Sequence, residues 1–122
     1  MSVKVIIADH DQLARTLIEA IVVGDEELEL MGSATDAAGA MELAAEHHPD
    51  VAVLDWVMPG GGAPQAARDI GHCSPDTRIV GLTVSDTQEA ELEMLRAGAR
   101  SFLVKGCSPE ELLRTIHTAM RI

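Results

Sequence analysis

The sequence has very few aromatic residues and cysteines. Trp56 and Phe102 are its only aromatic residues, so it lacks the ring surfaces on which a nucleic-acid base or a flavin usually stacks. Cys73 and Cys107 lie far apart and form no Cys-x-x-Cys motif, which is typical of reduced thiols in a cytosolic protein. No apolar run approaches the length of a membrane span or of a signal peptide. We therefore expect a soluble, cytoplasmic protein that is not held together by disulfides and does not contact a membrane.

Positive charge is also scarce. Nine Lys and Arg residues stand against 20 Asp and Glu residues, which gives a formal net charge of −11 at pH 7. Such a surface repels phosphate backbones, so we expect no direct nucleic-acid binding by this domain. The length of 122 residues and the apolar content of 47% are those of one globular domain, which we place at residues 1–122.

The apolar residues are arranged in five strand-helix units. Strands are predicted over residues 3–8, 28–34, 50–55, 78–83 and 101–105. Helices are predicted over 12–23, from Asp36 to Pro49, from Pro64 onward, from Ser85 or Asp86 to Gly98, and from the capping residue Ser108 onward. Since no hairpin turn separates the units, the strands need crossover connections. The pattern therefore predicts an α/β fold with a parallel sheet covered on both faces.

Polar residues follow the predicted strands at the points where ligands gather in open α/β sheets. These residues are Asp9, His10 and Asp11 after the first strand, Asp55 after the third, Thr83 after the fourth and Lys105 after the fifth. Two carboxylates about 4 Å apart repel by roughly 4 kcal/mol at an effective dielectric constant of 20, so Asp9 and Asp55 would attract a cation. Hard carboxylate oxygens suit Mg²⁺ better than zinc.

A carboxylate at such an edge can act as the nucleophile of phosphoryl transfer. Asp55 is the candidate acceptor, Thr83 would donate a hydroxyl hydrogen bond to the transferred group, and Lys105 would be its positive partner. Polar residues at strand ends are also common simply because strands must reach solvent. Four residues of complementary charge and hydrogen-bonding type at four strand ends nevertheless favour a functional site over coincidence.

The landmarks of this site are Asp9, Leu54-Asp55 with Met58-Pro59-Gly60, Leu82-Thr83, and the segment Gly98-Ala99-Arg100-Ser101-Phe102-Leu103-Val104-Lys105. With them, the sequence resembles the receiver domain of two-component response regulators over essentially its whole length. The resemblance implies a flavodoxin-like doubly wound (βα)5 fold with strand order 2-1-3-4-5. Residues 106–112 are most similar to receivers joined to LuxR-type helix-turn-helix domains, and receivers linked to cyclic-dinucleotide enzymes have similar glycine-rich loops.

The resemblance also implies a function in signalling and transcription regulation. Asp55 would be phosphorylated by a histidine kinase, with Mg²⁺ held by Asp9, Asp55 and the backbone carbonyl of Val57. Thr83 and Phe102 would then switch the face formed by the fourth helix, the fifth strand and the fifth helix. That face would meet an output domain, a downstream protein or a second copy of the chain. Such a domain is not an enzyme beyond catalysing its own phosphoryl transfer and dephosphorylation.

Two residues depart from the family pattern: Ala63, where the family generally has glycine, and His10. His10 stands where the family usually has a second acid that binds the metal, and an imidazole is a poor Mg²⁺ ligand. Asp11 would replace that acid if the loop shifted, although capping the first helix is its simpler role. A rival hypothesis is therefore an atypical receiver that binds partners without phosphorylation. A flavodoxin-like cofactor domain is disfavoured, because Asp9-His10-Asp11 offers acids where a phosphate cradle needs amides and little negative charge.

Overall fold

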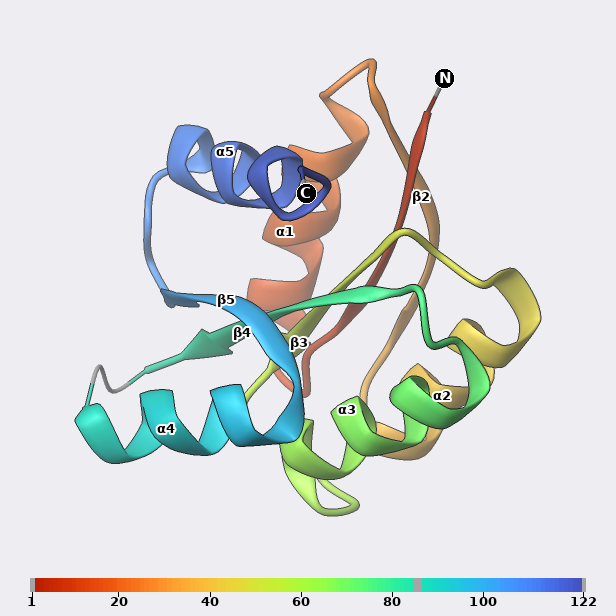
Figure 1. Cartoon of the computed structure of the whole chain (residues 1–122). Helices are drawn as coiled ribbons and strands as arrows, with labels where there is room; N and C mark the ends of the chain where they lie inside the picture. The colour runs from red at the N-terminus through yellow and green to blue at the C-terminus, as the bar shows by residue number, and fades with distance from the viewer. Residues whose placement is uncertain (1, 85–86, 122) are drawn as a thin grey trace.

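A computed structural model describes residues 2–84 and 87–121, which fold as a five-stranded parallel sheet between two layers of helices (Figure 1). The spatial order is β2-β1-β3-β4-β5, so the predicted fold class and strand order are confirmed. Every pair of neighbouring strands is parallel. The strands are β1 (Val3–Ala8), β2 (Leu28–Ala34), β3 (Val51–Asp55), β4 (Arg78–Thr83) and β5 (Ala99–Val104).

The helices divide between the two faces of the sheet. They are α1 (Gln12–Val23), α2 (Ala37–His47), α3 (Gly62–Cys73), α4 (Gln88–Ala97) and α5 (Pro109–Ala119). α1 and α5 cover one face, and α2, α3 and α4 cover the other (Figure 1). Because β3 lies in the middle of the sheet, all five of its residues are buried.

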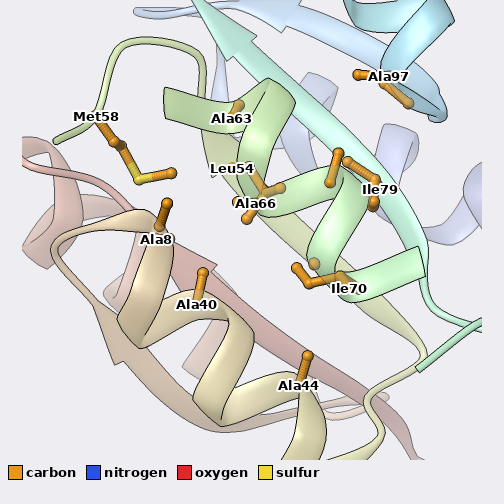
Figure 2. Packing of buried hydrophobic residues seen from close by; sticks show 14 of the residues in the cluster. Ala8, Ala40, Ala44, Leu54, Met58, Ala63, Ala66, Ile70, Ile79 and Ala97 are labelled. Carbon is orange, nitrogen blue, oxygen red and sulfur yellow. The ribbon is translucent and has the colours of Figure 1, made fainter. Parts of the chain in front are cut away.

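The two faces are packed with side chains of different size. Under α1 and α5 the core is made mostly of valine, isoleucine and leucine. Under α2 and α3 it is rich in alanine, and Ala40 and Ala44 of α2 lie opposite Ala66 and Ile70 of α3 (Figure 2). Small side chains let these two helices approach each other and the sheet closely, so the interior stays densely packed without large residues.

Capping residues begin the helices where the sequence predicts. The side chains of Asp11, Asp36 and Ser108 accept hydrogen bonds from the backbone N–H groups of Leu13, Gly39 and Glu111. Each bond satisfies one N–H group that the first helical turn leaves without a partner. The three predicted caps are therefore confirmed.

The predicted boundaries of α3 and β5 are wrong by one or two residues. α3 begins at Gly62 and not at Pro64, because Gly61 and Gly62 adopt positive φ angles that turn the chain into the helix two residues earlier. A Cβ on Gly62 would lie 2.9 Å from the carbonyl oxygen of Trp56, so only glycine fits there. β5 begins at Ala99 and ends just before Lys105.

The start of α4 was predicted at Ser85 or Asp86, and both lie outside the described residues. Thr87 caps this helix by accepting a hydrogen bond from the N–H group of Ala90. None of the helices in the described part of the chain has both the length and the apolar character that a membrane crossing requires.

We expect Ile116→Ala to lower the free energy of unfolding by about 2–5 kcal/mol, because Ile116 is fully buried between α5 and the sheet and its loss leaves a cavity. Urea denaturation followed by circular dichroism measures the change. Leu13→Ala is the matched control, since Leu13 is 77% exposed on α1 and its loss should change stability by at most about 0.5 kcal/mol. Equal losses for the two variants would contradict this packing of α5.

Candidate functional site

Side chains from four strand ends meet at the carboxyl edge of the sheet. Asp9 follows β1, Asp55 ends β3, Thr83 ends β4 and Lys105 follows β5. Asp9, Asp55 and Thr83 are the polar residues buried most deeply here, with 0%, 2% and 4% of their surface exposed. The strand order brings this about, because β3 lies between β1 and β4, and β5 lies beyond β4.

The ammonium group of Lys105 bridges the two buried acids. Its Nζ donates a hydrogen bond to Asp9 Oδ1 at 3.1 Å, and lies 3.0 Å from Asp9 Oδ2 and 3.1 Å from Asp55 Oδ1. The backbone N–H of Lys105 donates to the carbonyl of Thr83 at 2.7 Å, which fixes where its side chain starts. Burial alone would lower the pKa of Lys105, but the two carboxylates outweigh burial and raise it. Lys105 is therefore firmly cationic.

His10 lies directly against the acceptor candidate. Its Nδ1 is 2.5 Å from Asp55 Oδ2 and 3.9 Å from Asp9 Oδ1, and its side chain is 47% exposed. Sequence reasoning treated His10 as a substituted metal-binding acid and missed this contact with Asp55. The signal that could have revealed it is its position, one residue after a buried acid at a strand end beside β3.

The surroundings of the two acids shift their pKa values in opposite directions. Burial raises the pKa of Asp9, and the negative charge of Asp55 adds to this, while Asp11 N–H and Lys105 only partly oppose it. Burial would also raise the pKa of Asp55, but hydrogen bonds from His10 and Lys105 outweigh it and lower the pKa. Asp55 is therefore the acid that the site keeps ionised most strongly.

Asp11 contributes to the site through its backbone and not through its carboxylate. Its N–H group donates to Asp9 Oδ1 at 2.9 Å, while its own Oδ1 accepts a hydrogen bond from Leu13 N–H at 3.1 Å. Among the described residues, the group of potential ligand atoms within 4.8 Å of one another comes from Asp9, His10 and Asp55. Asp11 as a metal ligand stays a prediction that the capping bond disfavours.

The donor set suits a divalent cation, but its mixture of carboxylates and an imidazole is not specific for Mg²⁺. Asp9 Oδ2 is fully buried and has no hydrogen-bond partner of good geometry among the described residues, although the Lys105 ammonium is close by. It therefore keeps acceptor capacity for a cation. Val57 N–H lies 3.4 Å from Asp55 Oδ1, which places the backbone of Val57 beside the site, and its carbonyl as a ligand stays a prediction. The His10 imidazole is the donor that Mg²⁺ accepts least readily.

The two predicted switch residues lie on neighbouring strands. Thr83 is buried at the end of β4 and pairs with Val104 of β5. Phe102, two residues earlier on β5, is partly buried and packs against the core under α3 and α4. A movement of Thr83 toward Asp55 would therefore change the packing of β5, the strand that carries Phe102. The switching itself stays a prediction.

The sequence profile of the response regulator receiver domain matches residues 5–117. The chain belongs to the receiver domain family of response regulators. The resemblance predicted from the motifs at the strand ends is thereby confirmed.

This receiver is similar to a curated regulator and to response regulators of known structure. The uncharacterized transcriptional regulatory protein YxjL of Bacillus subtilis is 36% identical over 98% of this chain and 55% of its own length. The signal receiver domain of the response regulator NarL from Mycobacterium tuberculosis is 28% identical over 98% of this chain and 96% of its own, with a TM-score of 0.93. A LuxR-family two-component response regulator from Aurantimonas is 25% identical over 98% of this receiver and 86% of its own chain, with a TM-score of 0.91. The chain spans about half the length of the curated relatives it matches.

We expect Asp9→Asn and Asp55→Asn to change stability in opposite directions when metals are removed with chelator. The fold raises the pKa of Asp9 above its ordinary 3.8, so ionised Asp9 destabilises the domain at neutral pH and Asp9→Asn should be stabilising. The fold lowers the pKa of Asp55, so Asp55 adds stability above pH 3.8 that is lost as the pH falls through its folded pKa. Asp55→Asn should therefore be destabilising at pH 7.

Urea denaturation at pH 7 and at several lower pH values tests both signs. The difference between wild type and each variant should shrink as the pH falls below the range in which the acid ionises. Changes of the same sign for the two variants at pH 7 would contradict the assignment of opposite pKa shifts.

Proposed function

We propose that this receiver is a phosphoacceptor switch in which Asp55 takes a phosphoryl group from the phosphohistidine of a histidine kinase. The observation that carries the proposal is the position of Asp55, which is buried at the end of β3 and contacted by the Lys105 ammonium at 3.1 Å. We place the receiver unit at residues 1–122 and its action in the cytoplasm, in keeping with the free thiols of Cys73 and Cys107.

The residues of the site suit an in-line transfer. A carboxylate oxygen of Asp55 attacks phosphorus, the P–O bond forms, and the P–N bond to the imidazole of the kinase breaks. The Lys105 ammonium neutralises part of the charge of Asp9 and Asp55. After transfer it would contact the negatively charged oxygens of the phosphoryl group on Asp55. A divalent cation bound by Asp9 and Asp55 would supply further neutralisation. Thr83 would donate its hydroxyl to the new group. The same residues would later orient water for dephosphorylation.

The face formed by α4, β5 and α5 is the proposed relay surface. Leu95 on α4 and Val104 on β5 are 52% and 39% exposed, so apolar side chains of both elements are accessible to a partner. This exposure supports contact with an output domain, a downstream protein or a second copy of the chain. Phe102 lies on the same strand as Val104, so a change of its position would alter that face.

A second candidate function rests on His10. Because its Nδ1 contacts Asp55 Oδ2 at 2.5 Å, the acceptor oxygen is occupied by a neighbouring side chain. If this contact persists during signalling, the receiver would bind its partners without phosphorylation. The two functions differ in whether Asp55 gains a phosphoryl group, which can be measured directly.

We expect the purified chain to gain the mass of one phosphoryl group when treated with acetyl phosphate in the presence of Mg²⁺ or Mn²⁺. Intact-mass spectrometry measures the gain and peptide mapping locates it. Asp55→Asn should gain none, whereas Asp76→Asn, which alters an exposed acid in a loop away from the site, should behave as wild type. A folded wild-type chain that gains no mass with either ion would contradict the phosphoacceptor function and favour the second candidate.

We expect phosphorylation to change the surroundings of Phe102 through Thr83. Phe102 is the only phenylalanine in the chain, so fluorophenylalanine labelling gives a single ¹⁹F signal that reports on this ring. The signal should shift on phosphorylation of wild type. In Thr83→Ala the mass gain should remain while most of the shift disappears. An unchanged signal in phosphorylated wild type, or a full shift in Thr83→Ala, would contradict this switch.

A further inference from the structure

The cluster of Asp9, His10 and Asp55 combines two kinds of ligand that usually serve different metals. We propose that this site binds a first-row divalent transition ion such as Mn²⁺ in preference to Mg²⁺, with His10 as a direct ligand through Nδ1. The inference rests on the proposed function only in placing the cation beside the phosphoacceptor. It concerns the identity of the ion, which can be determined without phosphorylation.

The three donor atoms are already close to the spacing that a single ion requires. One ligand atom each from Asp9, His10 and Asp55 lies within 4.8 Å of the others. Two atoms that bind an ion at about 2.1 Å are at most about 4.2 Å apart, so the three donor atoms lie near this spacing even before an ion binds. The two acids are buried and held in place, whereas His10 is 47% exposed and has space to turn.

A second observation points independently to a cation. Asp9 Oδ2 is fully buried but accepts no hydrogen bond of good geometry within the described ranges 2–84 and 87–121. A buried carboxylate oxygen in this state is unfavourable unless a positive group completes its coordination. Lys105 Nζ compensates in part from 3.0 Å. A metal ion beside Asp9 and Asp55 would satisfy this oxygen directly.

The imidazole determines which ion the site prefers. Mg²⁺ keeps an octahedral shell of oxygen ligands and binds nitrogen reluctantly, while first-row transition ions accept imidazole more readily than Mg²⁺ does, Mn²⁺ the least among them. Mn²⁺ shares the octahedral geometry and the oxygen ligands of Mg²⁺, so the pair isolates the effect of the nitrogen. Any ion must also break the contact between His10 and Asp55 and displace Lys105. Both ions meet these obstacles equally, so their effect cancels in the ratio of the two affinities.

The experiment compares the affinities of Mn²⁺ and Mg²⁺ for the chelator-treated chain. Trp56 is the only tryptophan and is the residue after Asp55, so its fluorescence reports binding. His10→Asp restores an all-carboxylate site, His10→Ala removes the ligand, and His72→Ala changes an exposed histidine at the end of α3 as the control. Electron spin-echo spectroscopy of bound Mn²⁺ detects an imidazole nitrogen coupled to the ion.

We expect wild type and His72→Ala to prefer Mn²⁺ over Mg²⁺ about tenfold or more strongly than His10→Asp does. About tenfold is the lower end of the change in metal affinity that loss of a partner near a metal produces. His10→Ala should lose the nitrogen coupling and lose Mn²⁺ affinity more than Mg²⁺ affinity. Equal preferences in wild type and His10→Asp, or tighter binding of both ions by His10→Ala without nitrogen coupling in wild type, would overturn the proposal. The latter result would leave His10 as a hydrogen-bond partner that blocks the cation. Failure of the ion preference leaves the mass-gain test of Asp55 unaffected, so the two proposals fail separately.

Discussion

The contact of the Lys105 ammonium with Asp9 and Asp55 is the interaction on which the rest of this site depends. Two buried carboxylates at one sheet edge repel each other, and the ammonium lies within 3.1 Å of both. The contact is possible only because the strand order places β1, β3, β4 and β5 side by side, with every carboxyl end at the same edge. The fold and the charge arrangement therefore explain each other: the sheet gathers the acids, and the lysine makes their burial tolerable.

His10 gives this receiver a site that differs from a simple acidic one. Its ring occupies one oxygen of Asp55, while Lys105 contacts the other. The acceptor is thus held from two sides by groups that lower its pKa. The same ring brings a nitrogen donor to the place where a cation would sit, so one substitution affects both access to Asp55 and the choice of metal.

The sequence was informative wherever a local signal decided the structure. Strand composition predicted the fold class, and side-chain caps such as Ser108 marked helix starts, because both depend on residues close in the chain. The start of α3 was misplaced because Pro64 is the stronger local signal, whereas Gly62 begins the helix through a positive φ and a close approach to the Trp56 carbonyl. The strand order places His10 near Asp55, but sequence reasoning missed their contact, because it joins side chains 45 residues apart and depends on how one ring turns.

The most direct test of this account is a double-mutant cycle between Asp55 and Lys105, measured as free energies of unfolding in chelator at pH 7. If the ammonium and the carboxylate stabilise each other as the 3.1 Å contact indicates, Asp55→Asn and Lys105→Met should be coupled by roughly 0.5–3 kcal/mol. Additive effects of the two substitutions would show that Lys105 does not pair with Asp55 in solution, and the account of the site would be wrong.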